Sequence, residues 1–265
     1  MKRISDLEKL YAIEALENSF RTSKGSEFNT RLESEFSDKF GVKFSIGHVN
    51  ATAALHTALL SIDIKAGDEV IVPPLTMSST SIAVLQANAI PVYADIDLQT
   101  LTICPKSIKK NLTKKTKAII SVSVYGLPPN YKEILKICRD NKLYLIEDNA
   151  ECFLGKYKNK TVGCFGDFSA FSFQASKHMT CGNGGILCCN NIDLADKARK
   201  ISNLGYTTVS AKKMLIKKEE IQSPNFKRHS LLGYNYRMSE INAAVALAQL
   251  ERLDELVNIR KQSAK

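Results

Sequence analysis

The sequence contains no run of apolar residues long enough to cross a membrane as a helix, which requires about 20 residues. Its first ten residues, MKRISDLEKL, lack the apolar centre of a signal peptide. It has no low-complexity segment, and 44% of its 265 residues are hydrophobic, so the chain can bury a large core. We therefore expect a soluble cytoplasmic protein with no membrane partner.

The seven cysteines show neither CxxC spacing nor histidine partners at the separations that zinc sites use. Most of them are scattered, while Cys188 and Cys189 are adjacent within an apolar segment. We expect reduced, mostly buried thiols and no metal site.

The formal net charge of +10 raises the question of a nucleic-acid partner. The lysine-rich segments 109–117 and 212–220 have no interleaved aromatic residues and form no basic helix face. This pattern favours a solvated lysine-rich surface over a nucleic-acid interface, and we expect no nucleic-acid partner. A basic surface also attracts an anionic substrate.

Hydrophobic periodicity predicts an alternation of strands and helices after two amphipathic helices at 4–20 and 27–40. The predicted strands are β-branched and nearly continuously apolar, which indicates a mostly parallel central sheet flanked by helices in a three-layer αβα arrangement. The predicted strands are 43–49, 68–74, 90–96, 117–126 and 143–150, and the helices between them are 51–62, 78–88, 105–112 and 130–141.

The pattern loosens after Ala150. We predict a turn-rich excursion, two further strands, a helix, an exposed loop with short helical pieces and a final long helix that begins at a Ser239 cap. In that order, these segments are 155–167, 168–173, 184–189, 193–205, about 206–230 and 239–262.

Ligands of open parallel sheets bind at the carboxyl ends of the strands, so candidate site residues are sought there. Walker and GxGxxG patterns are absent. Where the strand 43–49 meets the next helix, the first turn consists of Ala51, Thr52 and Ala53, whose backbone N–H groups are available to an anion such as phosphate.

Two charged residues occupy the ends of other strands. Asp148 ends a strongly apolar strand, where a carboxylate is costly unless a cation or several donors meet it. Lys177 follows the strand that ends near Ser172, on a turn with glycines close behind. Burial leaves part of a lysine population neutral and nucleophilic, which suits a Schiff base with an aldehyde. An amine, a carboxylate for a ring nitrogen and a phosphate site together specify pyridoxal 5'-phosphate (PLP).

Several segments closely resemble the DegT/DnrJ/EryC1/StrS family of sugar aminotransferases, from about Phe28 to Lys265. They include VNATAALHTALL, LIEDNAECFLGKYKNKTVGCFGDFSAFSFQASKHMTCGNGGIL and LGYNYRMSEINAAVALAQLERL. The resemblance implies the fold of fold-type I PLP-dependent enzymes. It also implies that Lys177 binds PLP as a Schiff base and that Asp148 pairs with the ring nitrogen.

The same resemblance places the phosphate of PLP against Ala51, Thr52, Ala53 and Ser172. It further implies that Asn235, in GYNYRM, reaches the phosphate bound by a partner subunit. The expected active unit is therefore a homodimer with shared active sites.

The sequence departs from the family pattern at the cofactor. Glu151 stands where glutamine is common, and Met77 where an aromatic residue commonly stacks on the ring. We still expect both to contact PLP. Asn183 replaces the glutamate of the usual GEGG segment.

Family members continue into a smaller C-terminal domain. The expected domains are a PLP-binding large domain with N-terminal helices at 1–240 and a long helix at 241–265. This helix would lead to a small domain that is absent or truncated.

The function implied is a PLP-dependent aminotransferase that converts a nucleotide-linked keto(deoxy)sugar to the amino sugar in amino-sugar or polysaccharide biosynthesis. Glutamate is the expected amino donor, and pyridoxamine phosphate (PMP) is the intermediate form of the cofactor. Lys177 would act as anchor and as general acid and base. The sequence does not identify the sugar, the nucleotide or the aminated carbon.

Two alternatives stay open. A PMP-dependent sugar 3-dehydratase of the same family carries histidine at the lysine position, whereas this chain has Lys177 and places His178 one residue later. A non-catalytic PLP-fold binding or regulatory protein would not need the Lys177 and Asp148 pair, and its presence argues for catalysis.

Overall fold

The structure, a computed structural model, describes residues 3–19, 27–211 and 222–264. Its centre is a seven-stranded sheet in the order β1-β9-β8-β5-β4-β2-β3. All neighbouring strands run parallel except β9, which is antiparallel to both β8 and β1. The predicted, mostly parallel sheet is therefore confirmed. The strands are β1 (Phe44–His48), β2 (Glu69–Val72), β3 (Ile90–Tyr93), β4 (Thr116–Val122), β5 (Tyr144–Asp148), β8 (Phe168–Ser172) and β9 (Gly185–Cys189).

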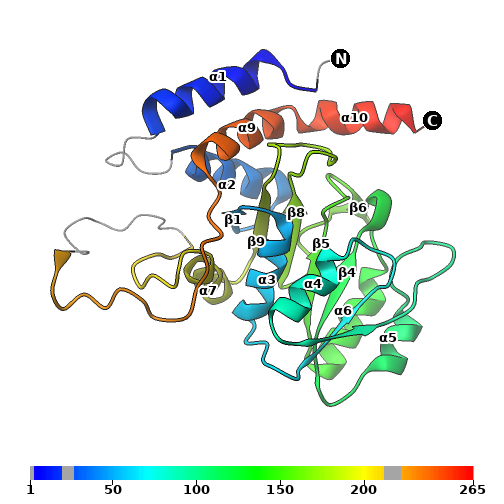
Figure 1. Ribbon diagram of the computed structural model, residues 1–265. Coiled ribbons are helices and arrows are strands. Elements are labelled where there is room, and N and C mark those ends of the chain that lie inside the picture. The colour runs from blue at the N-terminus through cyan, green and yellow to red at the C-terminus, as the bar shows by residue number, and fades with distance from the viewer. Residues whose placement is uncertain (1–2, 20–26, 212–221, 265) are drawn as a thin grey trace.

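Helices cover both faces of the sheet (Figure 1), which confirms the three-layer prediction. Two buried apolar clusters lie on opposite sides of the strands, because the side chains of each strand alternate between its faces. One cluster receives residues of α3 (Ala51–Ser61), α4 (Ser79–Gln86) and α7 (Ile192–Ser202). The other receives residues of α2 (Glu27–Phe40), α5 (Pro105–Asn111), α6 (Tyr131–Asn141) and α9 (Glu240–Glu251).

The two ends of the described chain meet along the top of the molecule in Figure 1. There α1 (Asp6–Glu14) packs against α9, and α10 (Leu253–Ser263) follows α9. A capping box between Ser5 and Glu8 starts α1, which continues as a π-helical turn at Ala15–Ser19.

The predicted long helix at 239–262 begins at its Ser239 cap as expected. It is interrupted at Arg252, where the backbone leaves helical values (φ −99°, ψ 8°). Because α9 packs closely on α1 and α2, it belongs to the same core as the rest of the chain. The division of the chain at residue 240 stays a prediction.

Two predicted segments differ in detail from the structure. The strand expected at 117–126 ends at Val122, and Val124–Gly126 forms a short 3₁₀ turn in which Tyr125 has a φ of +50°. The turn-rich excursion at 155–167 contains a small hairpin of β6 (Lys156–Tyr157) and β7 (Lys160–Thr161).

The buried carboxylate of Glu147 in β5 fixes this excursion. It accepts hydrogen bonds from the backbone N–H groups of Gly163, Phe165 and Gly166, at 2.7–2.8 Å. The Tyr131 hydroxyl donates to the same carboxylate at 2.9 Å. These donors replace the water that burial removes, so a charged group can stay inside the core.

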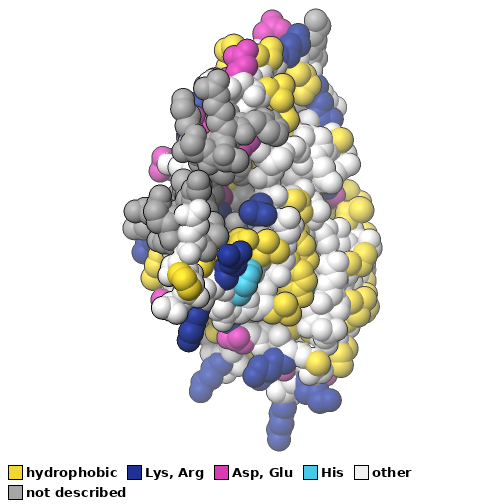
Figure 2. Space-filling model, turned by 60° about the vertical axis from the view of Figure 1, so that its left-hand side comes forward, with side chains coloured by type: hydrophobic (Ala, Val, Ile, Leu, Met, Phe, Trp, Pro, Cys, Tyr) yellow, Lys and Arg dark blue, Asp and Glu magenta, His cyan; other side chains and the backbone are white. Residues whose placement is uncertain are grey.

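The loop expected at about 206–230 is described in part. Its two arms come together at a bridge between Tyr206 and His229, while residues 212–221 lie outside the described residues. Figure 2 shows the face that includes this region. On this face, Lys and Arg side chains are mostly scattered among uncharged and apolar side chains, and several of them lie near one another at the bottom of the view.

Most of the cysteine thiols are buried, and burial keeps them protonated. Cys138, Cys152, Cys188 and Cys189 are buried, the other three are partly buried, and all seven are free thiols. Burial raises the pKa of Cys138, Cys152 and Cys188 to about 12. They are therefore protonated at neutral pH.

Across residues 3–19, 27–211 and 222–264, no helix combines the length and apolar character needed to span a membrane.

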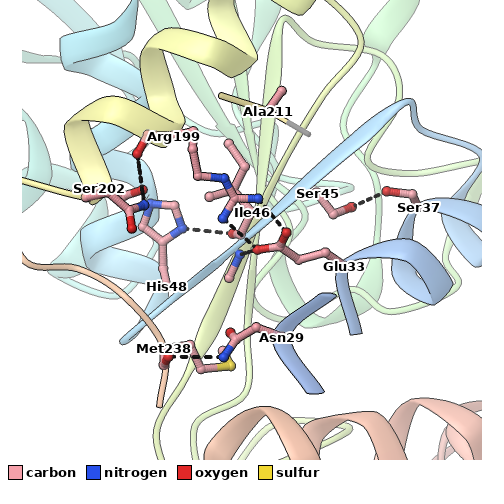
Figure 3. A network of polar contacts seen from close by, with 12 residues as sticks. Asn29, Glu33, Ser37, Ser45, Ile46, His48, Arg199, Ser202, Ala211 and Met238 are labelled. Carbon is pink, nitrogen blue, oxygen red and sulfur yellow. Dashed lines mark hydrogen bonds and ion pairs between the residues drawn. The ribbon is translucent and has the colours of Figure 1, made fainter. Parts of the chain in front are cut away.

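A buried polar network joins α2, β1 and α7 (Figure 3). Glu33 of α2 accepts from Arg199 of α7, at 2.9 Å for Nη1 and also from Nη2, and from the Gly47 backbone N–H at 2.7 Å. Ser37 and Ser45 bond to each other beside this pair at 2.9 Å. Because β1 leads directly into α3, the network holds the strand that delivers the N-terminus of α3.

Arg199→Met is expected to lower the free energy of unfolding by about 3–5 kcal/mol, because it leaves the Glu33 carboxylate buried without its cation. The double variant Glu33→Gln and Arg199→Met keeps an acceptor for Gly47 and removes the unpaired charge, so it should recover much of the loss. Urea unfolding of the two variants measures both effects. A loss of less than about 1 kcal/mol in the single variant, as for an exposed ion pair, would contradict the account.

Candidate active site

A cavity of about 360 Å³ lies where the carboxyl ends of β5 and β8 meet the N-terminus of α3. Its volume falls in the range typical of small-molecule sites. Eight residues singled out in the sequence line it together, although they come from distant segments of the chain. They are Ala51, Thr52, Met77, Asp148, Glu151, Ser172, Lys177 and Asn183.

Asp148 is the last residue of β5 and is 4% exposed. The Thr80 hydroxyl donates to its Oδ2 at 2.8 Å, and the Ala150 N–H donates to its Oδ1 at 3.2 Å. Burial raises the pKa of Asp148, while these donors and the Lys177 charge act in the opposite direction. The carboxylate thus has donors on both oxygens and still carries a desolvation cost, which a cation in the cavity would offset.

Lys177 approaches the cavity from the turn that follows β8. Its backbone N–H bonds to the Gln174 carbonyl at 3.0 Å, and its side chain is 14% exposed. Lys177 Nζ lies 3.1 Å from Glu151 Oε1, an ion pair inside the site. Oε2 of Glu151 also accepts the Tyr125 N–H at 3.3 Å, so this carboxylate is held between the turn at 124–126 and the lysine.

The N-terminus of α3 forms another wall of the cavity. Asn50 caps the helix, and its Oδ1 accepts the Ala53 N–H at 2.8 Å. The Ala51 and Thr52 amides belong to the first turn, where N–H groups have no partner within the helix. A Cβ on Gly185 of β9 would lie 2.6 Å from the Ala51 nitrogen, so glycine is needed there for the strand to approach the helix end.

The donor set fits the cofactor predicted from the sequence. PLP presents an aldehyde, a ring nitrogen and a phosphate, and the cavity offers an amine, a carboxylate and a helix N-terminus from three different elements. Ser172, at the end of β8, adds a hydroxyl, and Met77 adds an apolar side chain. The roles of these residues toward PLP stay predictions.

Two predicted site residues lie apart from the cavity. Ala53 is buried in α3, and its N–H is used by the Asn50 cap. It therefore does not offer the free amide that the sequence suggests, because the cap residue takes it. Asn235 is exposed, and its Oδ1 accepts from Arg237 Nε at 2.9 Å. Its expected role in a partner subunit stays a prediction.

His178 does not line the 360 Å³ cavity. It lines a neighbouring cavity of about 470 Å³, which also contacts Glu151 and Lys177. Burial, with smaller effects of the Arg260 and Lys177 charges, lowers the pKa of His178 to about 4, so its ring is neutral at pH 7.

Sequence reasoning missed several residues of the site. Asn50, directly before the helix, carried a capping signal that would have shown that Ala53 is not free. Thr80 carried no such signal, because its bond to Asp148 joins residues that are 68 positions apart. The other missed lining residues are Leu55, Ser79, Ala150, Gln174 and Ser176.

The fold and the site together define an α/β protein that directs a lysine, a buried aspartate and a helix N-terminus at one cavity. The comparison with known families agrees. The chain belongs to the DegT/DnrJ/EryC1/StrS aminotransferase family, whose model matches residues 3–265. Its fold is that of the fold-type I PLP-dependent aminotransferases, as predicted.

Relatives with names and solved structures resemble the chain over nearly its whole length. It is 36% identical over 257 residues to a GDP-perosamine synthase of Escherichia coli O157:H7, covering 97% of this chain and 66% of the relative. An aminotransferase structure from Psychrobacter cryohalolentis matches with a TM-score of 0.86 and 31% identity, over 95% of this chain and 63% of that one.

An Escherichia coli GDP-4-keto-6-deoxy-D-mannose-3-dehydratase with bound hydrated PLP matches with a TM-score of 0.88 and 27% identity, over 100% of this chain and 69% of that one. The chain spans just under two thirds of the length of the Escherichia coli O157:H7 GDP-perosamine synthase.

Asp148→Asn is expected to stabilise the PLP-free protein at pH 7, because it removes a buried charge. An asparagine can accept from Ala150 and donate to the Thr80 hydroxyl, which can turn toward Thr76. A raised carboxyl pKa means that the folded state binds the proton more tightly than the unfolded state. The aspartate protein therefore loses stability relative to the variant as pH rises from about 4 through that raised pKa.

Thermal unfolding of both proteins between pH 4 and 8 measures this difference. We expect the variant to unfold at a temperature higher by about 2–4 °C for each kcal/mol gained. The gap should widen as pH rises from about 4 and level off once the pH exceeds the raised pKa of Asp148. An Asp148→Asn protein that unfolds at a lower temperature at pH 7 would show that the charge is not a cost in the PLP-free state.

Proposed function

We propose that this chain acts as a PLP-dependent aminotransferase on a nucleotide-linked keto(deoxy)sugar, with glutamate as amino donor and PMP as the second form of the cofactor. The observation that carries the proposal is the convergence of the Lys177 amine and the buried Asp148 carboxylate on one cavity that the N-terminus of α3 closes. Family membership and the resemblance to a named GDP-perosamine synthase support the substrate class.

When bound, PLP supplies a carbonyl that condenses with amines and a ring that withdraws electrons from the bond being broken. Asp148 would keep the ring nitrogen of PLP protonated. The positive charge on that nitrogen would in turn stabilise the buried Asp148 carboxylate, whose pKa is otherwise raised by burial. The Ala51 and Thr52 amides, at the positive end of the α3 dipole, and the Ser172 hydroxyl would bind the phosphate.

Lys177 Nζ would have two tasks in this site. Its amine would hold the cofactor, and when not bonded to it the amine would take a proton from the donor α-carbon and, in the second half of the reaction, give a proton to the sugar carbon that receives the nitrogen. The Glu151 carboxylate, 3.1 Å from Nζ, is placed to hold the displaced lysine near the reacting atoms. The net charge of +10 favours the approach of an anionic nucleotide sugar.

A PMP-dependent sugar 3-dehydratase is the second candidate, because the chain is also similar to the dehydratase with bound hydrated PLP. The lysine at position 177 argues for amine transfer, since the dehydratases are expected to carry histidine there. Incubation with glutamate and a nucleotide keto sugar separates the two candidates: an aminotransferase releases the amino sugar, whereas a dehydratase releases a deoxygenated keto sugar.

Lys177→Ala is expected to abolish both the visible absorbance of covalently bound PLP and amine transfer from glutamate. The variant loses the ion pair with the partly exposed Glu151, so we expect the thermal unfolding temperature to fall by only a few degrees and the protein to stay folded. Absorbance titration with PLP and then glutamate, beside a Lys261→Ala control, measures the effect. Amine transfer that persists in the Lys177→Ala variant would exclude the proposed role.

The active unit that we propose is a homodimer in which Asn235 reaches the phosphate site of the partner. Lys177→Ala and Asn235→Ala homodimers should then each lose most of their activity. Heterodimers formed by mixing the two variants should regain activity, because one of their two sites receives an intact Lys177 from one subunit and an intact Asn235 from the other. Activity assays of the mixture, with the oligomeric state followed by sedimentation, test this expectation. A fully active monomer, or the absence of any recovery in proven heterodimers, would contradict it.

A further inference from the structure

The segment that carries Lys177 is held by side chains of the two C-terminal helices. Arg260 of α10 donates through Nη2 to the carbonyl oxygens of Ser176 and Lys177, at 2.7 and 2.8 Å. Gln249 of α9 accepts the Thr180 N–H at 3.1 Å. Each contact is made to the backbone, so it fixes the path of the chain rather than one side chain.

The same helices hold the glycine-rich continuation of the segment. Asn242 Nδ2 donates to the carbonyl oxygens of Cys181 and Asn183, at 3.1 and 2.7 Å. Asn242 and Gln249 lie seven residues apart, about two turns of α9, and Arg260 lies on α10 beyond the interruption at Arg252. Side chains of both helices thus contact one segment, residues 176–183, at both of its ends and in its middle.

The N-terminal segment strengthens this arrangement. Arg3 Nη2 donates to the Lys177 carbonyl at 2.8 Å, and the Arg3 carbonyl in turn accepts from Gln249 Nε2 at 3.0 Å. The Lys177 carbonyl oxygen therefore receives guanidinium donors from two segments that are far apart in the sequence. Gln249 is fully buried and also bonds to Glu8 of α1, so the anchor on the helix side is rigid.

We propose that Asn242, Gln249 and Arg260 are positioning residues that fix where the Lys177 amine enters the cavity. The inference rests on the proposed function, because it assigns these residues a task in cofactor attachment by Lys177. Residues 176–183 contain no helix or strand, so their carbonyl groups depend on side chains and water for partners. Without the helix contacts the turn would sample other paths, and Lys177 Nζ would spend less time at the position where it attacks the PLP carbonyl.

Arg260 gives the clearest test, because it is exposed and its replacement leaves the core intact. Arg260→Met removes both contacts that Arg260 makes, while Arg3 still donates to the Lys177 carbonyl, and Arg260→Lys keeps a cation with N–H donors on a shorter side chain. Lys261→Met is a matched control, because it removes the same charge from the neighbouring position of α10 and from the wall of the same 470 Å³ cavity.

Two readouts are needed: the rate at which PLP becomes covalently attached, followed by visible absorbance, and amide hydrogen exchange of peptides that cover residues 174–184. Since small displacements of a reacting group cost up to about 100-fold in rate, we expect attachment to be about ten-fold slower in Arg260→Met and intermediate in Arg260→Lys. Exchange in the 174–184 peptides should be faster in Arg260→Met. Lys261→Met should stay within about twofold of the unaltered chain, as is usual for surface substitutions.

The outcomes separate the inference from the proposed function. If the unaltered chain attaches PLP and Arg260→Met does so at the same rate, the inference is overturned and the proposed function stands. A slower rate without faster exchange also overturns it, because the effect would then not run through the backbone. If the unaltered chain does not attach PLP, the proposed function fails, and with it the task assigned to these residues.

Discussion

Asp148 ends β5 with 4% of its surface exposed, so its carboxylate lacks most of the water that stabilises a negative charge. The donors at Thr80 and Ala150 supply two hydrogen bonds, and burial still raises the pKa of the group. A buried carboxylate in this condition favours a cation that meets it inside the cavity. Two further features of the cavity accompany this constraint: the Lys177 amine lies on one wall, and the N-terminus of α3 forms another.

Three parts of the fold position the Lys177 amine at that cavity. The antiparallel pairing of β8 with β9 ends at Ser172 and Gly185, which brings the intervening turn back over the carboxyl edge of the sheet. Glu151 then holds the amine from within the site, and α9 with α10 holds the backbone from outside. Side chains of α9 and α10 thus contact the main chain around Lys177, although neither helix lines the 360 Å³ cavity.

Much of this arrangement could be predicted from the sequence, because apolar strands that alternate with amphipathic helices place Asp148 and Lys177 at strand ends. Other features leave no local signal. The antiparallel direction of β9 is one, since a fully buried strand has the same apolar pattern in either direction. The interruption of the C-terminal helix at Arg252 also leaves no local signal, because the apolar residues on either side of Arg252 keep the spacing of a continuous helix. The bonds of Thr80 to Asp148 and of Gln249 to Thr180 join distant parts of the chain, so only the folded structure shows them.

The central claim is that the amine of Lys177 is the group that binds PLP covalently. Borohydride reduction of the PLP-treated, unaltered chain, followed by proteolysis and peptide mass mapping, tests it most directly. The account predicts a single reduced pyridoxyl adduct on the peptide that contains Lys177. An adduct on another lysine, or none under conditions in which the protein stays folded, would contradict it.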